Sequence, residues 1–230
     1  MNRLFVTIHT DLRLQIRNGF YYAAAFVLGI YVLVLTQLPI ADVRLGWLLP
    51  ALVVNNLMIS SFYFVGGMVL LEKNDGTLTA QGVTPLRTGE YIWSKALTLT
   101  MLGMAYNGII AGLLDGPRAA LALMPGLAAA SLFYCLFGLA AVAYYSSLNR
   151  YLMPSLLWIG LLTLPLVPDA MGWQHPLLYL HPLFALLLLL HAATEPVGAG
   201  LLLYAVVYAA LWLAFAFWLA RHRIAQAVVG

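Results

Sequence analysis

Three histidines in the last quarter of the chain are the residues best suited to chemistry. His175, His181 and His191 follow closely after Asp169, and imidazole and carboxylate side chains can bind a metal ion or exchange protons. His175 and His181, however, each directly precede a proline, which is typical of a turn in the chain. The sequence therefore favours turn chemistry for this cluster, with metal binding or the lining of a gate as the alternative.

A second polar group lies within an otherwise apolar stretch. Asn56, Ser60, Tyr63 and Gly67 recur at helical spacing, so they share one face of a helix. Polar groups surrounded by lipid need partners. This face either bonds to neighbouring helices or lines a wet path for a substrate, and the sequence leaves both open.

Motifs for self-contained catalysis are missing from the sequence. Lys73 and Lys95 follow Glu72 and Ser94 rather than a glycine, so no phosphate-binding loop ends in Gly-Lys-Ser/Thr. There is also no His-Glu-x-x-His zinc motif, and no serine stands two residues after a glycine. We therefore expect no catalytic site, metal or cofactor in this chain, and any ATP hydrolysis must take place on another protein.

The composition places these residues in a membrane protein. The chain is 63% hydrophobic and 8% charged, with a mean hydropathy of +0.93, whereas soluble domains carry about 25% charged residues. The net charge of +3 comes from scattered basic residues, which argues against nucleic-acid binding. The single cysteine, Cys135, excludes a disulfide within one chain.

Charged residues divide the chain into seven uncharged stretches long enough to be considered as membrane spans, which need about 20 apolar residues. The stretches are 18–41, 45–71, 96–114, 119–149, 151–168, 170–194 and 196–220. The sixth is interrupted by polar residues and prolines between 172 and 182. We therefore predict an all-α integral membrane domain over residues 1–230, with six transmembrane helices and an outer re-entrant helical segment at 169–195 between spans 5 and 6.

The distribution of basic residues supports this count. With six spans and a cytoplasmic start, all eleven basic residues except Arg44 and Arg118 fall on the inner side. A seventh crossing would place Arg221 and Arg223 outside, against the positive-inside rule. The sequence thus predicts a bacterial inner-membrane protein with both termini in the cytoplasm.

The acidic residues carry a further implication. Four are expected at outer boundaries and four in cytoplasmic segments, so none is predicted inside a span: Asp42, Asp115, Asp169 and Glu195, and Asp11, Glu72, Asp75 and Glu90. Ion-coupled carriers commonly place a carboxylate within the bilayer. Proton or sodium coupling within this chain is therefore not expected.

Residues 1–18 form a segment with two faces. On a helical wheel Leu4, Phe5, Ile8, Leu12 and Ile16 lie opposite Arg3, Arg13 and Arg17. This pattern predicts an amphipathic helix in the inner membrane interface. A solvated leader is the alternative.

The longest charged connection, residues 72–95, is expected to face the cytoplasm. Thr84 before Pro85 is typical of an N-cap followed by proline at the first helical position, so we expect the next helix to restart there. The glycines at 76 and 82 predict a short helix between them. The alternative for this connection is a plain solvated linker.

This segment resembles the first cytoplasmic loop of type-2 ABC exporter permeases. The matching positions are Glu72, Gly76-Thr77-Leu78, Val83-Thr84-Pro85, Glu90-Tyr91 and Lys95. The six spans, the amphipathic start and the re-entrant segment are similar to that family's layout as well. Thr79 departs from the pattern, since the family commonly has Glu there. Within the family the chain is most similar to drug-exporter subunits of the fluoroquinolone-export type.

The resemblance implies a membrane-spanning permease subunit without its own ATPase site. It would pair with a second permease subunit, identical or paralogous, and each would dock an ABC ATPase that binds ATP and Mg. The coupling residues would come from the segment at 72–92, and the substrate path, for a hydrophobic or amphipathic compound, from the polar face of span 2. The coupling residues are Glu72, Gly76, Thr77, Leu78, Thr84, Pro85 and Glu90.

Two other classes of function remain open on the residues alone. An integral-membrane enzyme acting on lipids would need the outer histidines and Asp169 to converge. A membrane scaffold that does not transport would need no ATPase partner.

Overall fold

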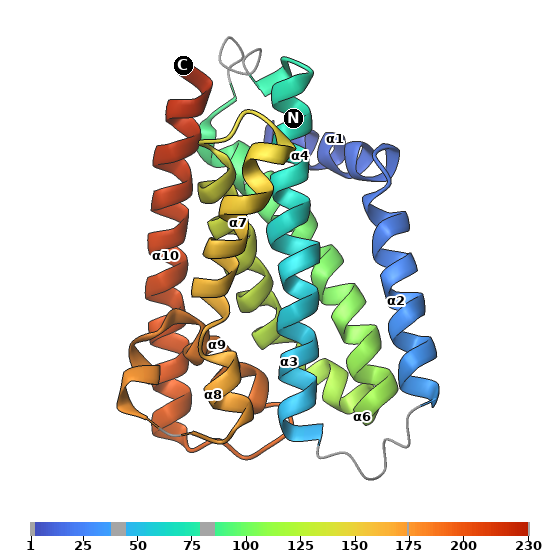
Figure 1. The fold of residues 1–230 in the computed structure, drawn as a ribbon, viewed down its shortest axis with the longest axis vertical. Coiled ribbons are helices and arrows are strands. Elements are labelled where there is room, and N and C mark those ends of the chain that lie inside the picture. Colours follow the sequence, from blue (N-terminus) through green and yellow to red (C-terminus); the bar gives the residue numbers. More distant parts are fainter. Residues whose placement is uncertain (1–2, 38–44, 79–85, 174, 230) are drawn as a thin grey trace.

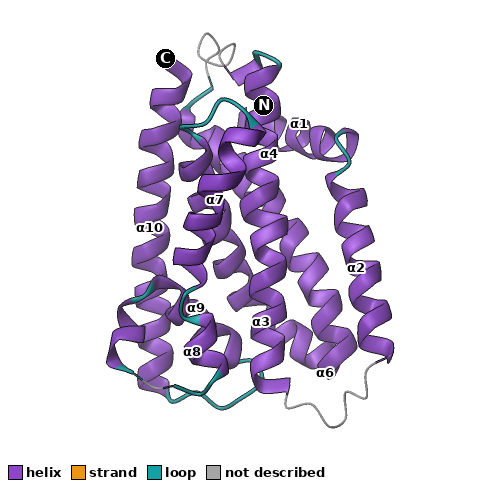
Figure 2. Ribbon diagram, in the orientation of Figure 1, coloured by secondary structure: helices purple, strands orange, loops and turns teal. Residues whose placement is uncertain are grey.

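The computed structural model describes residues 3–37, 45–78, 86–173 and 175–229. These residues form helices and loops, with no strand among them (Figure 2). The long helices run side by side along one axis, and both termini lie at the same end of the bundle (Figure 1). We refer to this end as the termini end and to the other as the far end.

The first two helices form a bent pair. Helix α1 (Arg3–Arg17) lies across the termini end, and α2 (Phe20–Gln37) descends from it at an angle of 59° (Figure 1). Gly19 makes the bend with φ +81°, a conformation that a side chain disfavours. The predicted N-terminal helix is therefore confirmed as an element.

The face that α1 buries was not predicted. Asp11 and Gln15 are its buried residues, and they pack against the rest of the chain. Phe5 and Ile16 from the apolar face are 71% and 53% exposed. The helix thus packs on the bundle through these two polar side chains and the half-buried Leu4, Ile8 and Leu12 beside them, and its exposed apolar residues can enter the membrane interface.

The next span contains an irregular helix. Helix α3 (Leu45–Leu57) continues through a π-helix, η2 (Met58–Tyr63), into α4 (Phe64–Asn74). A π-turn shifts every later side chain around the axis relative to an α-helix. The α-helical spacing assumed for Asn56, Ser60, Tyr63 and Gly67 therefore does not hold across this segment.

Helix α6 (Thr88–Val142) consists of two spans joined by a reversal. The spans are Thr88–Leu114 and Gly116–Val142. Gly116 has φ +83° and ψ 172° and is followed by Pro117, so the chain reverses at a residue that tolerates positive φ. Both halves pack against α10, and α6 forms the centre of the bundle.

The C-terminal part contains one long helix and several short ones. Helix α7 (Leu148–Thr163) is followed by α8 (Leu166–Ala170), the 3₁₀ helix η3 (Pro176–Leu180) and α9 (Pro182–His191). The last three lie towards the far end, and α10 (Ala199–Val229) returns to the termini end (Figure 1). The interruption predicted between 172 and 182 is therefore present.

Helix lengths confirm part of the predicted span count. Four helices are long and apolar enough to cross a membrane, and the bent pair of α1 and α2 makes up to five. Helix α7 has 16 residues, about 24 Å at the α-helical rise, which is short of the bilayer core of about 30 Å. The chain is a multi-pass α-helical protein, while the six-span count remains a prediction.

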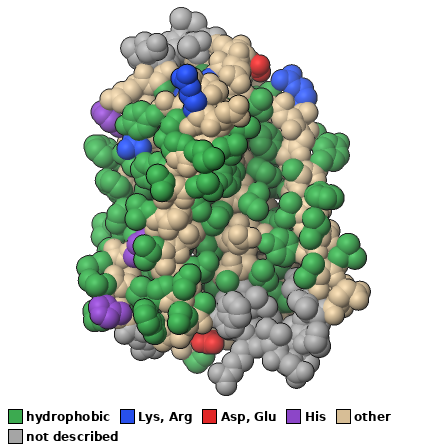
Figure 3. Space-filling view, in the orientation of Figure 1, with side chains coloured by type: hydrophobic (Ala, Val, Ile, Leu, Met, Phe, Trp, Pro, Cys, Tyr) green, Lys and Arg blue, Asp and Glu red, His purple; other side chains and the backbone are tan. Residues whose placement is uncertain are grey.

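Apolar side chains cover the surface as a membrane protein requires. Figure 3 shows them over the middle of one face, with Lys and Arg side chains gathered towards the termini end. Among the four helices long enough to span by themselves, α10 is the least buried, because only 17% of its apolar window is buried against 61% for Leu49–Asn74.

Candidate functional site

The termini end contains a buried cluster of three charged residues from three helices. The Nζ of Lys95 on α6 lies 3.0 Å from Oδ1 of Asp11 on α1 and 2.5 Å from Oε1 of Glu72 on α4. The side chain of Lys95 is 0% exposed, and those of the two acids are 4% and 9% exposed. We call Asp11, Glu72 and Lys95 the ionic centre.

Neighbouring groups satisfy the remaining carboxylate oxygens of the ionic centre. The Tyr91 hydroxyl donates to Oε2 of Glu72 at 2.7 Å, and the Ser94 hydroxyl donates to Oδ2 of Asp11 at 2.5 Å. The Lys95 ammonium also lies 4.5 Å from the centre of the Tyr91 ring. Each carboxylate therefore has two donors, the condition under which buried charges are tolerated.

The ionic centre fixes α1 to the two spans that flank the 75–87 connection. One ammonium faces two carboxylates, so removal of the lysine would leave two buried like charges. The Gln15 side chain adds a further bond from α1 when its Nε2 donates to the Thr98 hydroxyl at 2.7 Å. Movement of α4 relative to α6 must therefore move α1 or break this cluster.

The sequence did not reveal this cluster. Asp11 and Glu72 were expected in cytoplasmic segments outside the spans, but Glu72 and Lys95 belong to the span helices Leu49–Asn74 and Thr88–Leu114, and all three side chains are buried. The available signal was an isolated acid and an isolated lysine beside long apolar stretches, which need a buried partner.

Lys73 anchors the same end of α4 on another side. Its ammonium donates to the carbonyls of Ala143 at 2.7 Å and Tyr145 at 2.9 Å, where α6 ends. A lysine is well suited there because the last carbonyls of a helix lack internal partners and carry partial negative charge. Consecutive residues of α4 thus hold both the start and the end of α6.

Only some of the predicted coupling residues lie within the described ranges. Gly76 and Thr77 are exposed just after α4, and the Thr77 hydroxyl donates to the Glu72 carbonyl at 3.1 Å. A direct contact of Leu78 with an ATPase would need an exposed side chain, but Leu78 is 1% exposed and belongs to the hydrophobic core. Thr84 and Pro85, with most of the predicted 76–82 helix, lie outside the described residues.

The restart of the helix also differs from the prediction. Helix α6 begins at Thr88 with Arg87 as its N-cap, so Thr84 is not the cap of this helix. Glu90 stabilises the start, because its Oε2 accepts from the Arg87 backbone N–H at 2.9 Å. Glu90 therefore has a local structural role in the described chain.

The predicted substrate-path residues divide into two pairs. Asn56 and Ser60 are 0% and 2% exposed, and the Ser60 hydroxyl donates to the Asn56 carbonyl at 2.9 Å. Tyr63 and Gly67 are half-buried, with Tyr63 beside Tyr151 of α7. The path role of these four residues remains a prediction.

Hydrogen bonds at this level connect neighbouring spans. The Tyr106 hydroxyl donates to Oδ1 of Asn56 at 3.3 Å, and the hydroxyls of Ser61 and Ser131 are 2.7 Å apart. These contacts agree with the interpretation of the polar face as a connection between helices. The Nδ2 of Asn56 is buried without a hydrogen bond, so this amide group lacks a hydrogen-bond acceptor within one chain.

The histidines at the far end act mainly as helix caps. Nδ1 of His175 accepts from the Leu177 N–H at 3.3 Å, and Nδ1 of His181 accepts from the Leu183 N–H at 3.2 Å. Each residue is the N-cap of a helix whose next residue is proline. The turn chemistry predicted from the His-Pro pairs is confirmed.

His191 instead pairs with Asp169. Its Nε2 lies 3.0 Å from Oδ2 of Asp169, which connects α9 to α8. This hydrogen bond raises the pKa of His191, whereas burial lowers the pKa of His181. Within the described ranges no three His, Cys, Asp or Glu side chains are grouped so that they could hold a metal ion.

Comparison with known proteins gives a consistent result. The family model of the fluoroquinolones export permease protein family matches residues 2–230. Two relatives from Mycobacterium tuberculosis, in the strains CDC 1551 / Oshkosh and ATCC 25618 / H37Rv, are each described as a fluoroquinolones export permease protein. Each is 31% identical over 212 residues, covering 90% of this chain and 89% of the relative.

Proposed function

The chain belongs to the fluoroquinolones export permease protein family, and from this premise we propose that it is the membrane-spanning subunit of an ATP-driven type-2 ABC exporter. Two such subunits, identical or paralogous, would enclose the path, and each would dock one ATPase. ATP and Mg would bind to the ATPase, because this sequence has no phosphate-binding loop. The exporter would lie in the bacterial inner membrane with the termini end in the cytoplasm.

The observation that carries this proposal is the anchoring of the 75–87 connection. An ATPase that pushes on a loop does work on the membrane helices only if the loop's attachments are stiff. Here the ionic centre joins α4 to α1 and to the start of α6, and Lys73 joins α4 to the end of α6. A displacement of the connection would therefore be passed to three helices together.

This arrangement separates the proposed coupling residues by role. Asp75, Gly76 and Thr77 are exposed and would touch the ATPase. Leu78 is buried and would hold the connection against the bundle from within. Glu72 would act through the ionic centre rather than by direct contact.

The substrate proposal follows the names of the relatives, which are described as exporters of fluoroquinolones. We propose a related amphipathic aromatic compound as cargo. The η2 region, with Asn56, Ser60 and Tyr63, and Gly67 in α4 would face the path between the two subunits. The unpaired Nδ2 of Asn56 supports a role in which this face gains partners that one chain lacks.

The test is a pair of matched substitutions at the termini end, made in the permease co-expressed with its ATPase. Thr77→Arg places a bulky charge on the proposed docking surface, and Asn149→Arg places it on the exposed first turn of α7 at the same end. We expect Thr77→Arg to reduce co-purification of the ATPase and substrate-stimulated ATP hydrolysis by about thirtyfold, the scale of an interface hot spot. Asn149→Arg should leave both unchanged. Equal behaviour of the two variants would refute docking at this connection.

A further inference from the structure

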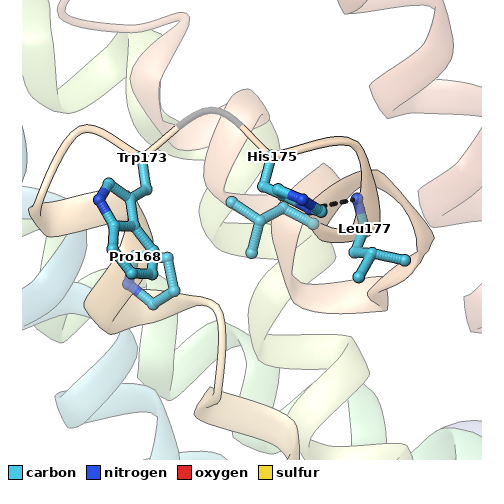
Figure 4. Close-up of a pocket in the computed structure, with 5 residues that line it drawn as sticks. Pro168, Trp173, His175 and Leu177 are labelled. Atoms are coloured by element: carbon cyan, nitrogen blue, oxygen red, sulfur yellow. Dashed lines mark hydrogen bonds between the residues drawn. The ribbon is translucent and has the colours of Figure 1, made fainter.

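A pocket at the termini end lies between α1 and α4, directly beside the ionic centre. It has a volume of about 390 Å³, and its lining includes Asp11, Leu14 and Arg17 of α1 and Leu71 and Glu72 of α4. Figure 1 shows α1 crossing the termini end beside α4. By contrast, the described lining of the far-end pocket in Figure 4 includes no carboxylate, lysine or arginine. The pocket at the termini end is therefore the one suited to a charged ligand.

The ionic centre leaves one negative charge beside this pocket. Lys95 supplies one positive charge to two carboxylates, and the hydroxyls of Tyr91 and Ser94 donate hydrogen bonds without adding charge. A carboxylate offers about four acceptor positions, so Asp11 and Glu72 can each accept further hydrogen bonds. Their side chains are no more than 9% exposed, and a net charge at such a site needs a counter-charge. The pocket thus favours a cation that donates hydrogen bonds.

Two further charged residues line the pocket. Arg17 ends α1 and Asp75 follows α4, and both are exposed. Neither forms an ion pair with another residue in the part of the chain that the structure describes. The ionic centre and these two residues together place three carboxylates against two cations. A ligand with a cationic end for the carboxylates and an anionic end for Arg17 matches this distribution.

The apolar part of the lining indicates what the rest of the ligand is. Leu14 and Leu71 belong to the pocket, and Leu71 is 39% exposed. On α1 the exposed Ile16 can enter the membrane interface, which places the pocket at the depth of lipid headgroups. A soluble zwitterion would leave this apolar surface uncovered, whereas a lipid would cover it.

We propose that this pocket binds the headgroup of phosphatidylethanolamine from the leaflet in which α1 lies. The primary ammonium lies among the carboxylates of Asp11, Glu72 and Asp75, and the phosphate pairs with Arg17. The glycerol and the first part of the acyl chains lie against Leu71. This inference goes beyond the proposed function: it needs α1 at the membrane interface but no ATPase docking.

The first experiment compares two lipids that differ only in the headgroup. Native mass spectrometry of the purified full chain in detergent measures binding of phosphatidylethanolamine and of phosphatidylglycerol with the same acyl chains. We expect phosphatidylethanolamine to bind about tenfold more tightly, because it alone brings a cation to the negative pocket. Soluble phosphoethanolamine at the same concentration should not displace it. Equal affinities for the two lipids, or displacement by phosphoethanolamine, would overturn the proposal.

A matched pair of arginine variants tests the phosphate end. Arg13 and Arg17 are both exposed on α1, and of the two Arg17 alone lines the pocket. We expect Arg17→Gln to weaken binding of phosphatidylethanolamine about tenfold, the low end for a hydrogen bond to a charged group. Arg13→Gln should bind as the unchanged chain does. Equal weakening by both variants would assign the effect to general attraction between α1 and phosphate, and the pocket proposal would be wrong.

The ammonium end is tested at Asp75. Asp75→Asn removes one of the three carboxylates with little change in shape, and we expect the preference for phosphatidylethanolamine over phosphatidylglycerol to fall about fivefold. Glu195→Gln is the control, because Glu195 is an exposed acid outside this pocket. An unchanged preference in Asp75→Asn, or the same fall in Glu195→Gln, would contradict the placement of the ammonium.

These outcomes are separate from those that test the proposed function. The lipid measurements use the permease alone, whereas ATPase docking is measured by co-purification from co-expressing cells. A lipid preference that depends on Arg17 and Asp75 supports the site even if no ATPase docks, and its absence overturns the site even if docking succeeds.

Discussion

The two ends of the bundle treat polar and aromatic groups in opposite ways. At the termini end, the charged side chains of the ionic centre are buried and fully bonded, with Lys95 between Asp11 and Glu72. At the far end, the ion pair of His191 and Asp169 is partly accessible, with side chains 18% and 14% exposed, and large apolar residues such as Trp173 face outward.

This difference indicates that the two ends differ in rigidity. Buried charges with several donors hold helices in one arrangement, since any relative movement exposes or unpairs a charge. Short helices joined by caps and one titratable pair can rearrange at lower cost. In the proposed exporter, the end that holds the ionic centre would receive force from the ATPase, and the far end would be free to rearrange.

The largest expected effect comes from removing Lys95, the cation of the ionic centre. Lys95→Met leaves Asp11 and Glu72 buried without a counter-charge, and we expect a loss of about 3 to 5 kcal/mol in the free energy of unfolding. Thermal and denaturant unfolding in detergent would measure it. The triple variant Asp11→Asn, Glu72→Gln, Lys95→Met removes all three charges and should recover most of the loss. If the triple variant is as unstable as Lys95→Met, the charges are not the cause.

A smaller effect is expected from the buried leucine beside the connection. Leu78→Ala should cost about 2 to 3 kcal/mol, because the side chain is 1% exposed and leaves a cavity. The loss should appear in the permease alone, without any ATPase, in the same unfolding assay. Unchanged stability in isolation would instead restore the interpretation of Leu78 as a surface contact.

Alanine substitutions at two glycines of α6 test how tightly the helices pack nearer each end. A Cβ at Gly138 would lie 2.6 Å from Cγ1 of Val65 and 2.8 Å from the Phe62 carbonyl oxygen. At Gly126, towards the far end, a Cβ would lie 3.0 Å from Cδ2 of Leu190 and 3.1 Å from the Leu189 carbonyl oxygen, so no contact is as close as those at Gly138. We expect Gly138→Ala to cost about 1 to 2 kcal/mol and Gly126→Ala less than 1 kcal/mol. Gly160→Ala, which meets nothing within 4 Å, is the control.

The smallest expected effect is a pH dependence at the far end. The pKa of His191 is raised above 6.5, chiefly by its hydrogen bond to Asp169 and further by the charges of Asp169 and Glu195. The stabilisation is therefore complete below about pH 6.5 and is lost as the pH rises through the raised pKa.

Hydrogen exchange of residues 166–180 would measure this dependence. After correction for intrinsic exchange rates, exchange should become faster as the pH rises. The change should correspond to a loss of less than about 1 kcal/mol in local stability. His191→Gln should remove the dependence, and the α1 segment should show none. A dependence that persists in His191→Gln would assign it to another group.

Local patterns predicted the features that depend on neighbouring residues. The helix at 1–18, the interruption after Gly172 and the caps at His175 and His181 all follow from residues within one or two turns of each other. Such signals are carried by backbone preferences and hydrophobic period, so they can be read before any tertiary contact is known.

Features that depend on distant residues could not be read in this way. Asp11 meets Lys95 across 84 positions, and nothing near either residue specifies the other. The burial of Leu78 depends on packing against other elements, and the π-helix at Met58–Tyr63 has no local sequence signal that we recognise. The amphipathic wheel of α1 was correct as a pattern, but it did not show that the most deeply buried residues on its apolar side are the polar Asp11 and Gln15.

The reversal at Gly116 has a consequence for how the protein is made. The spans Thr88–Leu114 and Gly116–Val142 are separated by a single residue, so no polar linker exists between them that could cross the bilayer by itself. With the termini end in the cytoplasm, as proposed, the two spans would enter the membrane together as a helical hairpin, and Arg118 would be carried across with the turn. Lengthening this turn would therefore alter membrane insertion before it altered the finished fold.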